Sequence, residues 1–295
     1  MSPPAERPIF PPFLVLIVGI FATSISAILI RFAQTEAPSL VIAAGRTTLA
    51  TLFLLPLALT RRRTELRTLP PAGYLLAALS GLMLALHFAS WITSLEYTSV
   101  ASASVLFATA PFWVALVSPL FLSESIPRPV QAGIALAFIG STIIALATGG
   151  GGTGRQTLLG NGLALVGAIT YAAYFLLGRR LRSSLSLVGY TTLVYGAAAV
   201  CLLTFALLSG QSFAGYSPQT YLLILLMALF PQLLGHSSFN YALGYLPAAF
   251  VSLASISEPV GATLLAFLIL QEVPGPATLL GGLFILAGVW VGSRK

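Results

Sequence analysis

Three polar side chains are conspicuous in an apolar stretch of the sequence at positions 221–242. Gln232, His236 and Asn240 are spaced four residues apart, so in an α-helix they would share one face, with Phe239 beside them. Such a face could hydrogen-bond the amine or carboxylate of a small molecule and stack against its ring. The same residue types also join membrane helices to one another, and the pattern leaves both interpretations open.

Two further pairs add polar and aromatic groups to apolar stretches. His87 and Trp91 are separated by four residues, and Tyr171 and Tyr174 by three, so each pair would lie on one helix face. Together they could form the wall of a binding site. A tyrosine pair is also typical of the aromatic belt at a membrane surface, so this alternative stays open for Tyr171 and Tyr174.

Glu258 is the strongest single candidate for a functional residue. It stands near the middle of an apolar stretch, where a charge costs about 3 kcal/mol or more unless it is paired or protonated. Arg46 is its natural partner, although this side chain could instead extend toward the membrane surface. The open roles are a structural ion pair, substrate contact or gating, and proton coupling. We hypothesise that Glu258 alternates between Arg46 and a proton or a substrate amine.

Two prolines interrupt apolar stretches at corresponding places. Pro111 and Pro259 lack the backbone N–H, which frees the carbonyl groups of Phe107 and Ser255 four residues earlier. Interruptions at matching positions in two similar halves favour a hinge near a transport site, and the alternative is a static kink.

The composition argues against an enzyme. The 295 residues include seven glutamates but no aspartate, with two histidines and one cysteine, so we expect no metal site, no cofactor and no catalytic residues. Hydrophobic residues make up 57% and charged residues 7% of the chain, and the mean hydropathy is +0.97. This balance is typical of a membrane protein and not of a soluble one.

The fold class that we predict is an all-α membrane protein with ten transmembrane helices joined by short loops. A span needs about 20 apolar residues. The predicted spans are 13–32, 40–58, 72–91, 99–121, 130–148, 158–177, 187–208, 221–242, 248–270 and 278–291.

The net charge of +7 would suggest a nucleic-acid partner in a soluble protein, but here the positive residues gather on one side of the predicted membrane. With the N-terminus inside, 11 Lys and Arg residues lie on the cytoplasmic side and two on the other side. The positive-inside rule therefore places both termini in the cytoplasm.

The chain contains an internal repeat. An offset of 148 residues aligns Tyr97 with Tyr245, Pro111 with Pro259, Glu124 with Glu272, Gly133 with Gly281 and Gly140 with Gly288. We expect two five-helix halves at 1–148 and 158–295, joined by a Gly-rich extracytoplasmic linker at 149–157. Because five is odd, the halves enter the membrane from opposite sides, an arrangement that favours alternating access.

The repeat resembles that of the drug/metabolite transporter superfamily, in its ten-helix EamA branch. The resemblance covers essentially the whole chain and is carried by NGLALVGAITYAAY at 161–174, LPAAF at 246–250, SEPV at 257–260, FLSE at 121–124 and LQE at 270–272. It implies a pathway lined by the first four helices of each half, with the fifth and tenth helices peripheral. Among the family's exporters, the YddG-type aromatic amino-acid exporters are the preferred comparison.

We therefore predict a secondary transporter of the plasma membrane, in a bacterium the inner membrane, that exports amino acids, aromatic ones among them, or similar small metabolites. No ATP-binding motif is present, so gradients would drive it. Efflux of drugs or quaternary cations is the alternative within transport, and a non-transporting sensor or structural protein is the alternative of another class. The expected partners are the small-molecule substrate and the lipid bilayer, with the chain as a monomer or weak dimer.

Overall fold

A computed structural model describes residues 8–147, 155–265, 267–268, 273 and 275–294. Over these residues the chain forms helices and connecting turns, with no strand. Nine helical segments among them are long and apolar enough to span a membrane, and the tenth apolar helix, Pro276–Gly292, is shorter at 17 residues. The all-helical membrane fold expected from the sequence is therefore confirmed.

The predicted spans correspond to these helices, although several are divided or longer than expected. The first part of the chain forms α1 Pro12–Ser24, α2 Ser26–Ala33, α3 Ser39–Arg61, α4 Arg63–Thr68, α5 Pro71–Tyr97, α6 Val100–Phe107, α7 Ala110–Phe121 and α8 Arg128–Ala147. The second part forms α9 Arg155–Arg182, α10 Leu187–Leu208, α11 Pro218–Met227, the π-helix η1 Ala228–His236, α12 Ser237–Ala242, α13 Ala248–Ser255, α14 Glu258–Leu265 and α15 Pro276–Gly292. Most of the predicted linker, at 149–154, lies outside the described residues.

Three spans are interrupted. The first breaks at Ile25, between α1 and α2, where both neighbouring residues are serines. The fourth breaks between α6 and α7 and the ninth between α13 and α14, just before Pro111 and Pro259. These prolines were expected well inside continuous helices. Each is instead the second residue of a new helix, because proline fits the first turn, where its missing N–H leaves no bond unmade.

The eighth span contains a π-helix, which the sequence pattern did not predict. In η1 the backbone is wound more widely than in an α-helix, and Pro231 lies within it. Gln232 and His236 therefore lie in π-helical turns, and Asn240 lies in the α-helix that follows, α12. The three side chains contact different parts of the bundle.

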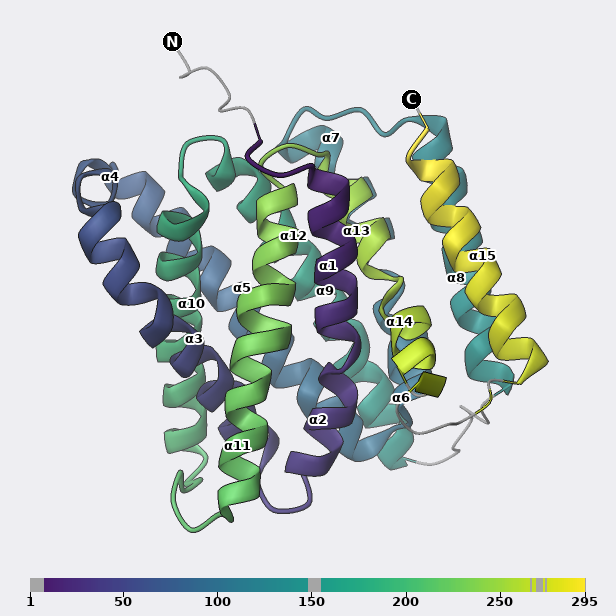
Figure 1. Ribbon diagram of the computed structural model, residues 1–295, viewed down its shortest axis with the longest axis horizontal. Helices are drawn as coiled ribbons and strands as arrows, with labels where there is room; N and C mark the ends of the chain where they lie inside the picture. Colours follow the sequence, from purple (N-terminus) through teal and green to yellow (C-terminus); the bar gives the residue numbers. More distant parts are fainter. Residues whose placement is uncertain (1–7, 148–154, 266, 269–272, 274, 295) are drawn as a thin grey trace.

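The helices α8 and α15 pack side by side at the edge of the bundle (Figure 1). Glycines make this contact close: a Cβ atom on Gly281 or on Gly288 would lie only 2.5 Å from a carbonyl oxygen, that of Gly140 or Gly133, respectively. Gly133 and Gly281 are equivalent in the repeat, as are Gly140 and Gly288. Gly133 packs against Gly288, and Gly140 packs against Gly281. Gly288 therefore packs against α8 of the same chain, and the two helices lie at the edge of the bundle.

Different helices begin and end at the two ends of the bundle. The described chain begins α1 and finishes α15 at the same end, the upper end in Figure 1, while α2 and the start of α6 lie toward the other. In the interior, α5 packs along α9, and α10 packs against both α3 and α5. Helices from both halves therefore enclose the centre.

We expect Gly140→Ala to destabilise the protein because the added methyl group would collide with the backbone of α15. The cost should be about 1–3 kcal/mol, seen as a lower melting temperature in detergent. Gly162→Ala is the matched control, since nothing lies within 4 Å of its added Cβ and alanine is the better helix former. Equal melting temperatures for the two variants would contradict the packing argument.

Candidate functional site

A cavity of about 510 Å³ lies between the two halves of the bundle. It is lined by residues of α1, α2, α3, α5, α6, η1, α9 and α14, together with Ile144, Ser99 and the α13–α14 break. Seven of the residues singled out in the sequence border it: Arg46, His87, Trp91, Tyr171, His236, Glu258 and Pro259. Because Ile28 of α2 and Ser99 and Val100 at the start of α6 also line it, the cavity reaches the end of the bundle that holds α2 and α6.

Aromatic rings form one wall of the cavity. Phe107 is central, with its ring centroid 4.9 Å from that of Tyr171, 5.0 Å from Trp91 and 5.6 Å from His87. The His87 ring also lies 4.8 Å from Tyr171, and its Nδ1 is 3.0 Å from the carbonyl oxygen of Gly167. This wall offers apolar and π surface to a bound molecule.

Arg46 is the buried charge of the site, with 1% of its surface exposed. One guanidinium nitrogen donates to the Gln232 side-chain oxygen at 3.0 Å and another to the Ser26 hydroxyl at 3.3 Å. The guanidinium also lies 4.5 Å from the ring centroid of Phe88. Its Nε has no hydrogen-bond partner.

Arg46 and Glu258 border the same cavity but do not form the ion pair considered from the sequence. The ion pairs in the described part of the chain are Arg62–Glu65 and Arg179–Glu124. The two Nη atoms of Arg46 donate to Ser26 and Gln232 instead. The expected structural pairing is therefore absent from this conformation.

Glu258 is the first residue of α14 and does not lie within a continuous helix as expected. At a helix N-terminus the backbone dipole favours a negative side chain, which lowers the cost of placing a carboxylate here. The Thr23 hydroxyl donates to the Gly19 and Ile20 carbonyls, both at 3.1 Å, and the Ser24 hydroxyl donates to the Glu258 backbone oxygen at 3.0 Å.

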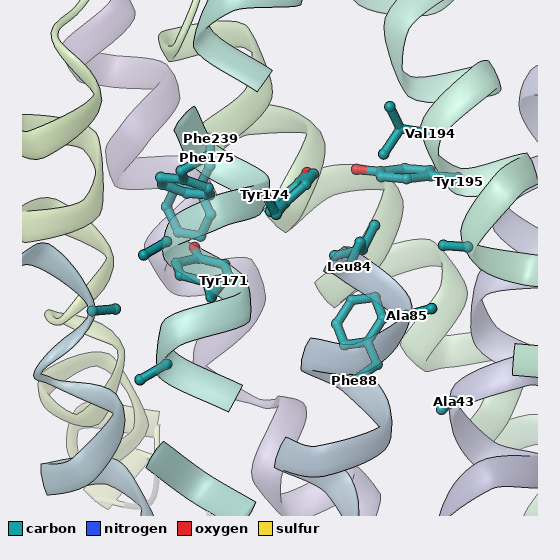
Figure 2. Close-up of a cluster of buried hydrophobic side chains, with 14 of the residues drawn as sticks. Ala43, Leu84, Ala85, Phe88, Tyr171, Tyr174, Phe175, Val194, Tyr195 and Phe239 are labelled. Carbon is teal, nitrogen blue, oxygen red and sulfur yellow. The ribbon is translucent and has the colours of Figure 1, made fainter. Parts of the chain in front are cut away.

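Tyr174, Phe239 and Asn240 were expected at the substrate site but do not line the cavity in this structure. They are fully buried in a layer beyond Tyr171, where the Tyr174 hydroxyl donates to the Asn240 side-chain oxygen at 2.6 Å. The Asn240 amide nitrogen donates to Tyr195 at 3.1 Å, and Figure 2 shows the two tyrosine hydroxyls pointing toward each other. Tyr195 belongs to α10, and no periodic pattern in the sequence indicated it.

An ion pair lies beyond this buried layer, toward the end where α1 begins. The Arg179 Nε is 2.7 Å from a Glu124 carboxylate oxygen, and another Arg179 nitrogen donates to the Leu243 carbonyl at 2.8 Å. The Tyr241 hydroxyl also donates to the Phe10 carbonyl at 2.9 Å. Arg179 is one of the arginines counted on the cytoplasmic side, and the 148-residue offset aligns it with Arg31.

The opposite end is held by different polar contacts. Gln34 donates to the Ile92 carbonyl at 2.8 Å, and Arg31 donates to the Thr98 carbonyl at 3.2 Å. In the connection between α2 and α3, Glu36 accepts hydrogen bonds from the Thr220 hydroxyl at 2.7 Å and the Ser217 N–H at 3.0 Å. These bonds hold the pKa of Glu36 below its usual value.

A multi-pass bundle with two similar halves around a central cavity is the architecture of a membrane transporter. The chain belongs to the EamA-like transporter family, whose model matches residues 11–146 and 158–294. The resemblance noted in the sequence is thereby confirmed, as is a multi-pass membrane location.

Among similar proteins, an uncharacterized transporter of Archaeoglobus fulgidus is 28% identical over 221 residues, which are 74% of each chain. A probable terminal-alkyne amino-acid exporter of Streptantibioticus cattleyicolor is 29% identical over 194 residues, 66% of this chain and 64% of the relative. One solved crystal structure covers 96% of both chains with a TM-score of 0.77 at 18% identity, a likeness that shows the fold.

We expect Arg179→Gln to loosen the end of the bundle where the Arg179–Glu124 pair lies. The readout is labelling, by a membrane-impermeant maleimide, of a cysteine placed at the buried Ala242 in a Cys201→Ser background. Ala242 adjoins Leu243, whose carbonyl accepts from Arg179. Loss of a partly exposed pair worth about 1 kcal/mol should raise the labelling rate roughly five-fold.

The matched control for this experiment is Arg180→Gln. This neighbouring arginine is exposed and lies over the Phe121 ring, 5.3 Å from its centroid, without a part in the Arg179–Glu124 pair. It should label like the parent protein. If Arg179→Gln also labels at the parent rate, the pair does not hold this end closed.

Proposed function

We propose that the protein is a secondary transporter that exports amino acids, aromatic ones among them, or similar small metabolites. The observation that carries the proposal is the central cavity, which combines a buried arginine, a carboxylate and an aromatic wall. A cavity with a few convergent polar groups on an apolar background suits a small amphipathic molecule. The Streptantibioticus relative, named as a probable amino-acid exporter, supports this substrate class.

Alternating access is the mechanism that fits these features best. In the proposed cycle, ten spans form two inverted halves with both termini in the cytoplasm, as the distribution of Lys and Arg favours. The cavity then reaches the extracytoplasmic side, and the Arg179–Glu124 pair closes the cytoplasmic side. The helix breaks before Pro111 and Pro259 serve as hinges, and Tyr174, Phe239 and Asn240 meet the substrate when the halves exchange roles. The unit that performs this cycle is a monomer or weak dimer.

Efflux of quaternary cations is the second candidate, and one specific observation favours it. Glu258 forms no ion pair with Arg46, and aromatic rings border the same cavity, an environment that attracts an organic cation. A transporter of this kind would have little use for the buried Arg46. A sensor would bind such molecules without moving them.

The proposal is tested by the flux of labelled Phe, Tyr, Trp, Thr and a quaternary ammonium dye through proteoliposomes. We expect the amino acids to move and the dye to remain, with a rate that depends on the pH gradient if protons drive transport. Movement of the dye alone would establish the second candidate instead. Binding without flux would identify a sensor.

The aromatic wall gives a second prediction. Trp91→Ala should slow the flux of Phe about three- to ten-fold, because a ring contact is worth about 0.5–1.5 kcal/mol, and should affect Thr less. Trp290→Ala is the control, since this tryptophan lies on the peripheral helix α15 and is 59% exposed. An equal loss for Phe and Thr would show that Trp91 does not contact a substrate ring.

A further inference from the structure

No carboxylate in the described part of the chain lies within ion-pair distance of the buried Arg46. Its contacts are the neutral side chains of Gln232 and Ser26 and the face of Phe88. A cation at this depth is costly unless an anion compensates for it. Glu258 borders the same cavity but is not in ion-pair contact. The positive charge of Arg46 therefore has no anion in ion-pair contact with it.

Two nitrogen atoms of residues that line the cavity have no hydrogen-bond partner. The Nε of Arg46 and the Nδ1 of His236 are both buried without a hydrogen-bond partner, and both residues line the cavity. Arg46 is 1% exposed and His236 7% exposed. Native proteins rarely leave such atoms unpaired, and a guanidinium edge suits a carboxylate.

Glu258 supplies the opposite charge. It lies at the start of α14 and borders the cavity, so a carboxylate is placed where an ammonium group could meet it. The break in the first span links the two charges. Ser24 donates to the Glu258 backbone, and Ser26, on the other side of Ile25, accepts from Arg46.

Arg46 and Glu258 are not repeated in the two halves, whereas the glycines of the scaffold are. With the 148-residue offset, the glycines of the α8–α15 contact occur in both halves, whereas Arg46 aligns with Val194 and Glu258 with Ala110. Each charge is thus present once, in one half each. Charges that only held the halves together would have no reason to differ from the glycines in this way.

From these contacts we infer that Arg46, with His236, binds the carboxylate of the substrate and that Glu258 binds its ammonium group. The substrate class is a zwitterion whose apolar remainder lies against the wall formed by Phe107, Trp91 and Tyr171. This inference rests on the proposed function and deepens it, because it assigns the two ends of the substrate to different helices. A molecule with one charge leaves the other site charge uncompensated.

The test uses three compounds that share one ring: phenylalanine, phenethylamine, which lacks the carboxylate, and 3-phenylpropionate, which lacks the amine. Binding is measured by Trp91 fluorescence in a Trp113→Phe, Trp290→Phe background, and flux is measured in proteoliposomes. The parent protein should bind phenylalanine about ten- to hundred-fold more tightly than either analogue, as expected when a charge-assisted contact is lost.

The charge variants should then separate the two ends. Arg46→Gln should lose affinity for phenylalanine but not for phenethylamine, whereas Glu258→Gln should lose affinity for phenylalanine but not for 3-phenylpropionate. Arg180→Gln, which removes an exposed arginine, controls for net charge. If Arg46→Gln fails to fold, Arg46→Lys keeps the charge without the planar fork and should bind phenylalanine with intermediate affinity.

The outcomes distinguish the inference from the proposed function. If phenylalanine moves but all three compounds bind alike, or the variants keep the parent preference, the inference is wrong and transport stands. If phenylalanine binds with the expected preference but does not move, the inference stands and the transport function is wrong. If phenylalanine neither binds nor moves, both are wrong.

Discussion

The structure depends on one constraint of the bilayer: a backbone polar group in the hydrocarbon core must find its partner inside the protein. A helix satisfies its own groups, so an interrupted helix is tolerated only where protein or a polar cavity surrounds the break. The three interruptions, at Ile25, before Pro111 and before Pro259, obey this constraint, since each adjoins a residue that lines the cavity. The site and the breaks therefore occupy the same place in the bundle.

The two halves share a scaffold and differ at the centre. The breaks before Pro111 and Pro259 correspond under the 148-residue offset, as do the glycines between α8 and α15. The break at Ile25 and the π-helix η1 have no counterpart, because α9 and α5 run on as α-helices at the equivalent positions. These two irregular elements pack together, with a Cβ on Gly235 meeting Thr23. The features that are repeated form the scaffold, and the features that are not repeated lie at the site.

Sequence patterns predicted the parts of this structure that depend on local chemistry. Hydropathy located α10 at the observed bounds, Leu187–Leu208, and charge and rarity singled out Arg46 and Glu258, which both border the cavity. The patterns did not predict features that depend on packing between helices distant in the sequence. A helical period cannot reveal η1 or the contact of Gln232 with Arg46, and Tyr195 meets Asn240 because α10 packs near α12.

The end of the bundle that holds the Arg179–Glu124 pair also bears on the proposed cycle. Alternating access requires that each side can open, so the contacts that close a side must be specific without being strong. The Arg179–Glu124 pair is partly exposed, with 25% and 21% of the two side chains accessible, and such pairs contribute about 1 kcal/mol or less. The Tyr174–Asn240–Tyr195 contacts beneath it are neutral hydrogen bonds, each worth about 1 kcal/mol net. In the proposed cycle, a closure made of several such contacts is weak enough for differential substrate binding to reverse it.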